Sequence, residues 1–464
     1  MNAVTQPQSV ELLVKGCDVV TLDSDGTVLT DGAVAVDNGN IVWIGSSEDS
    51  SRFSAKSVID GRGKVAMPGL IDAHFHTAQQ LLRGKLQAIA RKRPLKLPVW
   101  KNYLIPFESC LEPDDVYLSG LVAYTNMIQV GTTCFAESGG PHPDEMGRAA
   151  MDVGIRGFIA LSTVDQSEQI GAEVPANMLM NHDQALANNV ALVKRWKDNN
   201  RVKAWLALRQ IIVCSPELIK DISAAAHELG VKIHTHLCEG SYEIDYALEK
   251  FGKRPTEWLG ELGVLSSHLH CAHSVLLSPE EVDLYQKYRL SLCHCGFGNY
   301  AIGHPRLIEM WRRGIDIGLG TDGPGAAGTL DLFQVAHVTR VGQQAVNSAI
   351  YHQREPISNE ELLRIATVGG ARALGIADQI GSLETGKKAD FLLCDTNTLD
   401  HAPIYDIGFV AANLIVGRDV NTVVVDGNVV MKDRVMTTMD VEAIKAKLKE
   451  RLPKISERFE RLVA

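Results

Sequence analysis

The chain has 464 residues and is 45% hydrophobic, which suffices for a large packed core in two or three domains, or for one barrel and a smaller domain. Its formal net charge of −10, without any basic run, argues against nucleic acid or an anionic membrane as a partner. The 9 cysteines are scattered and include no C-x-x-C motif, so we expect reduced thiols in a cytoplasmic protein rather than disulfides. No apolar stretch approaches the roughly 20 residues of a membrane span, and no secretory signal is evident at the N-terminus.

The two ends of the chain share a pattern of short strands separated by turns. Residues 9–66 cluster β-forming side chains between D-G, N-G and G-R-G breaks, and GNIVWIG in this part resembles GNVVMKD near the other end. We therefore predict one small β-sandwich domain built from residues 1–66 and 386–440. Residues 67–385 would form a domain inserted into it, and residues 441–464 a C-terminal helix.

The middle of the chain alternates strand-like and helix-like segments. A helix is predicted to begin after Ser215 and to end at Gly230, because serine is a favoured N-cap and glycine a favoured helix stop. Ser278 and Glu281 have the spacing of a capping box at the start of another helix. Such alternation over about 300 residues predicts a parallel α/β arrangement.

Histidines and acidic residues follow the ends of several predicted strands. His74 and His76 come after KVAMPGLID, His236 and Glu239 after GVKI, His273 after SSHLHCA, and Asp322 after DIGLGT. Polar groups that converge from different strand ends are what the active site of an α/β barrel requires. Because no G-x-G-x-x-G follows an early strand and no P-loop is present, a nucleotide-binding sheet has little support.

The histidine spacing indicates a metal site. His74 and His76 form an H-x-H motif, which on an extended segment turns both imidazoles to one side, as two ligands of one ion require. His234 and His236 form a second such pair. Three imidazoles and the carboxylate of Asp322 suit zinc, iron or cobalt. The alternative, hydrogen-bonded core histidines, explains one or two of these residues but not the whole set.

The segments PGLIDAHFH, HTHLCE, AHSV and GTDG, with GSLETGKKADF near the end, together resemble the amidohydrolase superfamily. The subgroup is the one of atrazine-type hydrolases and purine-like deaminases, and the resemblance runs over nearly the whole chain. It implies an α/β fold, a distorted (β/α)8 TIM barrel with a small β-sandwich from both termini. It also implies that His74, His76, His236 and Asp322 hold a divalent transition metal. RQIIVCS has no lysine to bridge two ions, so we expect one zinc, cobalt or iron ion per chain.

The same resemblance assigns the catalytic roles. Glu239 matches the proton shuttle, and His273 matches the histidine that polarises the water or the leaving centre. Asp322 is expected to orient the water as well as to bind the ion, and His234 to be structural. The ion would lower the pKa of its water towards about 7, and Glu239 would protonate the departing nitrogen.

Three pocket-shaping segments differ from those of related deaminases. LALRQIIVCSPEL has Arg209 where a histidine is usual, HCGFGNYAIGHP starts at His294 in place of H-N-P-x-S-N, and DGPGAAGTLDLF lacks the usual asparagines. We expect Arg209, His294, Phe297 and Trp100 to contact the substrate, with Arg209 donating a fork to a carbonyl or carboxylate. The alternatives are a structural ion pair for Arg209 and core packing for the aromatic residues.

This pattern resembles the branch of phenylurea and molinate (thiocarbamate) hydrolases. The favoured prediction is therefore a hydrolase that cuts an amide-, urea- or (thio)carbamate-type N–C(=O) bond in a small apolar molecule, as in xenobiotic degradation. The alternative is a deaminase of an amino-substituted N-heterocycle such as a purine, pterin or triazine. Dehalogenation is disfavoured because a halide needs no proton from Glu239, and a non-catalytic scaffold because the ligands are retained. The resemblance also implies that the protein forms a homo-oligomer.

Overall fold

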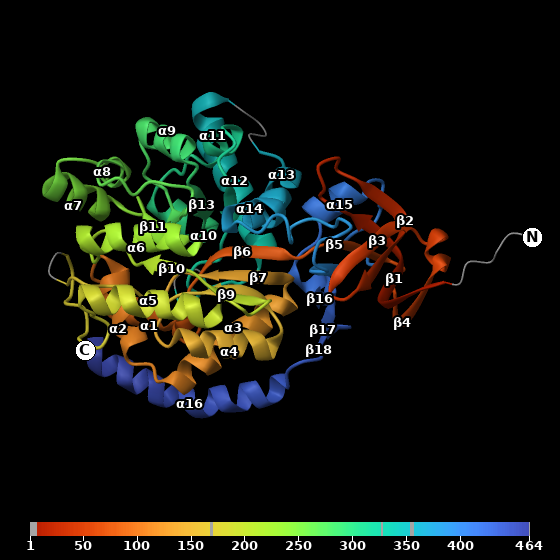
Figure 1. Cartoon of the computed structure of the whole chain (residues 1–464), viewed down its shortest axis with the longest axis horizontal. Helices are drawn as coiled ribbons and strands as arrows, with labels where there is room; N and C mark the ends of the chain where they lie inside the picture. The colour runs from red at the N-terminus through yellow and green to blue at the C-terminus, as the bar shows by residue number, and fades with distance from the viewer. Residues whose placement is uncertain (1–6, 168–169, 326–327, 353–356, 464) are drawn as a thin grey trace, which may run out of the picture.

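The structure is a computed structural model that describes residues 7–167, 170–325, 328–352 and 357–463. It contains a barrel wrapped by helices and, at one end of the molecule, a sheet to which both ends of the chain contribute (Figure 1). This agrees with the predicted α/β barrel carrying a β-domain from both termini.

The terminal sheet joins the two ends of the chain through β5 and β15, which pair antiparallel with Ala66 opposite Leu393. One buried cluster on this sheet includes Val14, Ile41 and Phe391, so it has a hydrophobic core of its own. The strands of this sheet are β1 (Gln8–Val20), β2 (Val28–Asp37), β3 (Asn40–Ser46), β4 (Phe53–Asp60), β5 (Lys64–Pro68), β15 (Phe391–Asp395), β16 (Val420–Val425), β17 (Asn428–Lys432) and β18 (Val435–Met436).

The barrel consists of two parallel sheets, ordered β6-β7-β8-β9 and β10-β11-β12-β13-β14. Its strands are β6 (Leu70–Phe75), β7 (Thr132–Glu137), β8 (Arg156–Ile159), β9 (Val202–Ala204), β10 (Leu206–Leu208), β11 (Ile233–Leu237), β12 (Leu269–His273), β13 (Ser291–His294) and β14 (Ile317–Leu319). Counted with β9 and β10 as one strand interrupted at Trp205, they give eight barrel strands in the described part of the chain. A bridge between Phe75 and Asp322 closes the ring. The predicted distorted (β/α)8 barrel is confirmed.

Helices cover the outside of the barrel (Figure 1). Ser215 caps the first turn of α6 by accepting a hydrogen bond from the Leu218 amide, and Gly230 ends the helix in the left-handed conformation, as predicted. Ser278 and Glu281 form the predicted capping box of α9. The α-helices are α1 (Lys85–Ala90), α2 (Ile105–Ser109), α3 (Pro113–Gln129), α4 (Pro143–Val153), α5 (His182–Trp196), α6 (Pro216–Leu229), α7 (Ser241–Phe251), α8 (Pro255–Glu261), α9 (Pro279–Tyr288), α10 (Gly296–Ile302), α11 (Leu307–Arg312), α12 (Leu332–Tyr351), α13 (Asn359–Arg364), α14 (Gly370–Leu374), α15 (Ile407–Asn413) and α16 (Val441–Val463).

Short helical turns complete the described elements: η1 (Asp49–Arg52), η2 (Thr77–Leu82), η3 (Trp100–Leu104), η4 (Ile365–Gly369) and η5 (Gly417–Asp419). The long helix α16 runs along the barrel surface (Figure 1) and anchors Phe459 edge-on against Phe107 of α2, with 5.3 Å between the ring centroids. Among the described helices, none combines the length and the apolar character that a membrane crossing needs.

Candidate metal centre

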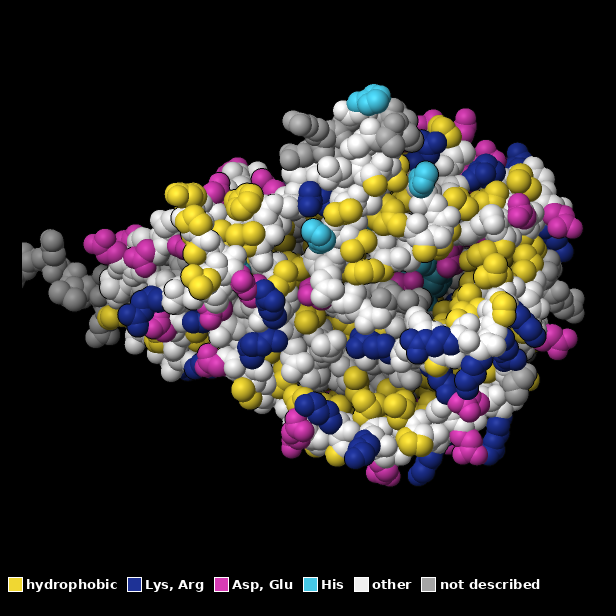
Figure 2. Space-filling model, turned by 180° about the vertical axis from the view of Figure 1, so that it is seen from behind, with side chains coloured by type: hydrophobic (Ala, Val, Ile, Leu, Met, Phe, Trp, Pro, Cys, Tyr) yellow, Lys and Arg dark blue, Asp and Glu magenta, His cyan; other side chains and the backbone are white. Residues whose placement is uncertain are grey.

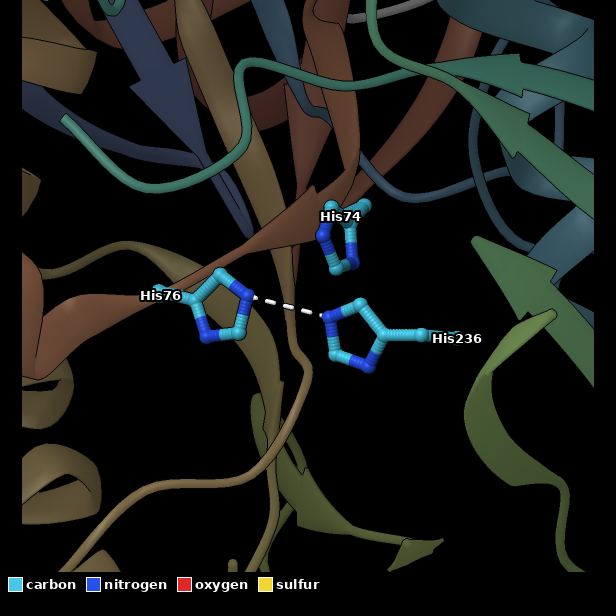
Figure 3. Close-up of side chains that lie close together, drawn as sticks. All are labelled: His74, His76 and His236. Carbon is cyan, nitrogen blue, oxygen red and sulfur yellow. Dashed lines mark hydrogen bonds between the residues drawn. The ribbon is translucent and has the colours of Figure 1, made fainter. Parts of the chain in front are cut away.

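The predicted metal ligands converge at the C-terminal ends of the barrel strands. His74 lies at the end of β6 with His76 just beyond it, His236 lies on β11, and Asp322 follows β14. Their ligand atoms fall into two overlapping groups, His74–His76–His236 and His74–His273–Asp322, and within each group all the atoms lie within 4.8 Å of one another. Figure 3 shows the rings of the first group turned toward one shared space.

The orientation of His236 determines which ring nitrogen is free to bind an ion. Its Nδ1 lies 2.8 Å from the backbone carbonyl of Arg209. Because a carbonyl can only accept, Nδ1 carries the hydrogen and Nε2 carries the lone pair. That Nε2 lies 3.2 Å from Nε2 of His76 (Figure 3), whose Nδ1 contacts the Ser138 hydroxyl at 2.7 Å.

His74 and Asp322 complete this donor set. Nε2 of His74 is buried, has no hydrogen-bond partner in the described part of the chain, and lies 3.3 Å from Oδ1 of Asp322. The same oxygen lies 3.6 Å from Nε2 of His76. On its other side, Nδ1 of His74 contacts Nε2 of His234 at 2.9 Å, so His234 lies behind the ligands and not among them.

The charges of these residues suit a cation. Burial, followed by the nearby charge of Arg209, holds the pKa of His76 well below its ordinary value, and burial has the same effect on His236. Burial alone would raise the pKa of Asp322, but the close approach of His74 and the charge of His273 lower it further than burial raises it. Neutral imidazoles with inward lone pairs and an ionised carboxylate fit a divalent transition metal.

Glu239 and His273 lie at the edge of the ligand group. Oε1 of Glu239 is 4.0 Å from Nε2 of His273, and Oε2 accepts a hydrogen bond from Gln210 at 3.2 Å. The phenol of Tyr242 also contacts Glu239, and burial, followed by the charge of Glu239, raises the pKa of Tyr242 well above its ordinary value. The glutamate carboxylate is therefore held in place next to the ligands while 18% of its side chain remains exposed.

Arg209 lies beside the site, but its guanidinium is directed elsewhere. It makes a two-pronged ion pair with Glu108, at 2.8 and 3.2 Å, and both side chains are buried. The expectation that this fork faces the substrate is thus corrected. The structural ion pair, the alternative left open by the sequence, is what the structure contains, because a buried charge requires a partner. The contact of Arg209 with the site is its carbonyl, which orients His236.

The other predicted substrate residues are dispersed. The indole of Trp100 donates a hydrogen bond to the hydroxyl of Tyr242 at 3.1 Å, and Tyr242 in turn contacts Glu239. His294 lies behind His273, with Nδ1 3.0 Å from the amide nitrogen of Asn299. Phe297 lines a cavity of about 410 Å³ formed with residues of α12, α13 and α15 rather than with the metal ligands. Substrate contact by these three residues stays a prediction.

Four residues that contact the site were not predicted from the sequence. Ser138, Gln210, Tyr242 and Asn299 all contact a predicted site residue. Ser138 directly follows β7, so the strand-end pattern that indicates the histidines could also have indicated it. Asn299 stands at the last position of the H-N-P-x-S-N pattern counted from His294, so that pattern could have indicated it. Figure 2 shows a hollow in one face of the molecule, with histidine and acidic side chains in its depth and hydrophobic side chains along its rim.

A barrel with imidazoles and a carboxylate at its strand ends defines the class of metal-dependent hydrolases built on this fold. The chain belongs to the amidohydrolase family, whose model matches residues 65–430. It is 31% identical over 446 residues to the 5-methylthioadenosine/S-adenosylhomocysteine deaminase of Caldanaerobacter subterraneus subsp. tengcongensis, covering 95% of this chain and 98% of that protein. The predicted superfamily and the prediction of a metal-dependent enzyme acting on carbon–nitrogen bonds are confirmed.

Solved structures show the same fold. An adenosine deaminase from Xanthomonas campestris with bound zinc has a TM-score of 0.88 and 26% identity, with 97% of this chain and 100% of that chain covered. The atrazine chlorohydrolase of Arthrobacter aurescens in complex with zinc has a TM-score of 0.82 and 23% identity, with 95% and 100% covered. The second likeness supports the fold alone.

Proposed function

We propose that this protein is a metal-dependent aminohydrolase that removes the amino group of an amino-substituted N-heterocycle, in particular an aminopurine nucleoside, as ammonia. The observation that carries this proposal is the placement of the Glu239 carboxylate next to the ligand group, 4.0 Å from His273. The similarity over 95% of the chain to a protein named as a deaminase of 5-methylthioadenosine and S-adenosylhomocysteine supports it.

The proposed chemistry divides the work between the ligands and Glu239. A divalent ion held by His74, His76, His236 and Asp322 supplies an activated water at neutral pH when it is bound. Glu239 takes up a proton on the side of the pocket that faces the ligands and delivers it to the departing nitrogen. This delivery is required because an amide ion is a very poor leaving group. Gln210 and Tyr242 hold the carboxylate in the orientation that this transfer needs.

Cleavage of an amide-, urea- or thiocarbamate-type bond, the favoured reading of the sequence, has lost part of its support. That reading depended on three unusual pocket segments, and in one of them the fork expected to bind a carbonyl or carboxylate, that of Arg209, is paired with Glu108. Trp100 and Tyr242 provide aromatic rings close to Glu239, with centroids 6.5 Å apart, and planar heterocycles bind well beside such rings. Deamination, the alternative reading, is therefore the better supported one.

The test is a substrate panel on the zinc-loaded protein. The panel compares 5′-methylthioadenosine, S-adenosylhomocysteine, adenosine, guanine and an aminotriazine with phenylureas and thiocarbamates, and measures ammonia and substituted amines separately. We expect ammonia from at least one aminopurine compound, with the keto product detected by mass spectrometry. Release of a substituted amine from a urea or thiocarbamate, without ammonia from any heterocycle, would overturn the proposal in favour of the first reading.

We further propose one divalent ion per chain and a homo-oligomer. Among the described residues, the two candidate ligand groups share His74 and so form one site, which supports the first point. Metal analysis of the purified protein should give about one ion per chain, and a reproducible ratio of two would contradict it. Light scattering measures the oligomeric state, and a monomer at all concentrations would contradict the second point.

A further inference from the structure

Asn299 lies behind His273 and hydrogen-bonds to two histidines at once. It lies on α10, the short helix that follows β13, and is fully buried. Its Oδ1 is 3.0 Å from Nδ1 of His273. Its Nδ2 lies 3.2 Å from the backbone carbonyl of His273 and 3.0 Å from Nδ1 of His294.

These contacts determine which way the amide of Asn299 points. A backbone carbonyl only accepts hydrogen bonds, so the atom that faces the carbonyl of His273 must be the NH2 group. The oxygen of the amide must then face Nδ1 of His273, and that nitrogen must carry a hydrogen. The arrangement holds whether His273 is neutral or protonated, since Nδ1 carries a hydrogen in both states.

The second hydrogen of the amide fixes His294 in the opposite tautomer. It donates to Nδ1 of His294, which must therefore keep a lone pair there and carry its hydrogen on Nε2. Burial lowers the pKa of His294 to about 3, so the ring is neutral at physiological pH and remains able to accept. His294, whose contact with the substrate stays a prediction, thus supports the amide that holds His273.

We infer that Asn299 is a positioning residue, which keeps hydrogen on Nδ1 of His273 so that Nε2 alone faces Glu239 and the reacting groups. The inference rests on the proposed function, because it matters for turnover only if His273 takes part in it. Nε2 of His273 lies 4.0 Å from Oε1 of Glu239. A ring held in this way can exchange a proton or a hydrogen bond with the pocket only through Nε2, whereas a freely flipping ring would present the wrong nitrogen or a carbon.

A spectroscopic test needs no substrate. In zinc-loaded protein labelled with 15N-histidine, long-range proton–nitrogen spectra report which ring nitrogen carries hydrogen. Spectra of His273→Gln and His294→Gln assign the two rings. We expect hydrogen on Nδ1 of His273 and on Nε2 of His294, and loss of this pattern in Asn299→Leu. A His273 ring with hydrogen on Nε2 alone, or a His294 ring with hydrogen on Nδ1, would overturn the inference whatever the enzyme's reaction is.

A double-mutant cycle then tests the function of Asn299 with the substrate that the panel identifies. Asn299→Leu should lower kcat by about 10–100-fold with little change in KM or zinc content, as is usual for residues that orient a catalytic group. Asn299→Asp, which keeps an acceptor for Nδ1, should recover part of this loss. In a His273→Ala background, Asn299→Leu should add little, because residues that act through one another are not additive.

Tyr300→Phe is the matched control. It removes the hydrogen bonds of the Tyr300 hydroxyl with the carbonyl of Thr339 and the side chain of Gln343, and it keeps the ring that lies against His294. Its kcat should stay near that of the parent. An equal loss in Tyr300→Phe, or independent losses from Asn299→Leu and His273→Ala that multiply, would show that only the packing of α10 matters and would overturn the positioning role. If no panel compound turns over, the proposed function fails while the spectra still decide the inference.

Discussion

Each imidazole of the metal site is held from behind by a different group. His74 contacts His234, His76 contacts the hydroxyl of Ser138, and His236 donates to the carbonyl of Arg209. Such contacts fix the tautomer and the ring orientation of a ligand before the ion arrives. The sequence places His74 beside His76 and His236 beside His234, but the orientation of each ring depends on these partners.

Glu239→Gln tests the proton shuttle. The amide keeps the size of the side chain and can still meet Gln210 and Tyr242, but it cannot accept and release a proton. We expect turnover to fall by at least about 100-fold, the scale of general acid–base catalysis, while the zinc content stays unchanged. Steady-state kinetics and metal analysis on the same preparation measure both. Full activity in this variant would remove Glu239 from the mechanism.

Glu108→Gln tests the buried ion pair beside the site. It leaves the guanidinium of Arg209 buried without its charge partner, so the free energy of unfolding should fall by about 3–5 kcal/mol. Zinc affinity should fall as well, because the carbonyl of Arg209 orients His236. Urea unfolding and zinc titration are the measurements. Glu442→Gln, which removes an exposed partner of Lys445, is the control and should leave both values near the parent.

The buried His270 predicts a dependence of stability on pH. Burial is the main cause that lowers its pKa from 6.5 to about 3, although its Nε2 contacts the carbonyl of Ala73. As the pH falls below 6.5, His270 becomes protonated in the unfolded chain, whereas in the folded protein it stays neutral until about pH 3. The free energy of unfolding is therefore unaffected by the protonation of this group above pH 6.5. Below pH 6.5 it declines by about 1.4 kcal/mol per pH unit as the pH falls toward 3.

The comparison of His270→Gln with the parent measures this contribution. Urea unfolding at several pH values between 5 and 7 (roughly the upper part of the titration range) gives the slope for each protein. The stability of the variant should decline less steeply with falling pH. Equal slopes would show that His270 is not the group that resists protonation.

At the scale of elements, the strand ends of the barrel determine where the chemistry lies. His273 ends β12 and Asp322 follows β14, and both have a left-handed backbone with φ of 69° and 60°. Residues other than glycine adopt this conformation only when the surroundings enforce it, and such residues cluster at functional sites. The local patterns that predict strands and caps do not predict the left-handed conformation at these two residues.

The helix α16 should stabilise the barrel through Phe459. This side chain is fully buried and packs edge-on against Phe107. Phe459→Ala should lower the free energy of unfolding by about 3–5 kcal/mol, because it leaves a cavity in a packed interface. Thermal and urea unfolding measure the effect. Leu462→Ala, a change at an exposed position of the same helix, should have little effect, and an equal loss there would contradict the packing argument.

At the scale of the whole molecule, Arg156 connects the barrel to the terminal sheet. Its guanidinium on β8 lies 2.6 Å from Asp390, just before β15, and 3.3 Å from Asp426. Arg156 and Asp390 are almost completely buried, so the pair is shielded from solvent. The sheet from both termini is thus anchored to the barrel by a charge pair as well as by the chain itself.

Arg156→Met tests this connection. It leaves Asp390 buried without its partner, so the free energy of unfolding should fall by about 3–5 kcal/mol. The exposed pair Arg418–Asp400 is the matched control, and Arg418→Met should cost at most about 1 kcal/mol. Urea unfolding measures both. If the two variants lose equal stability, burial does not strengthen the connection.

The sequence by itself predicted the barrel and the β-domain from both termini, which the structure confirms. It also predicted four metal ligands, whose side chains the structure brings together. These predictions depend on local patterns. An H-x-H motif on a strand places two imidazoles on one side, and polar residues at the ends of parallel strands must meet at one rim of the barrel. Caps such as Ser215 also depend only on residues a few positions away.

Only the tertiary structure decided what surrounds those residues. Glu108 and Arg209 are 101 positions apart, so nothing near Arg209 shows that its charge is already paired. Asn299 contacts both His273, 26 positions before it at the end of β12, and His294 on β13, and these contacts depend on how the neighbouring strands are placed. A buried charge or amide takes whichever partner the fold brings within hydrogen-bond distance, and that partner decides whether a side chain supports the site or faces the substrate.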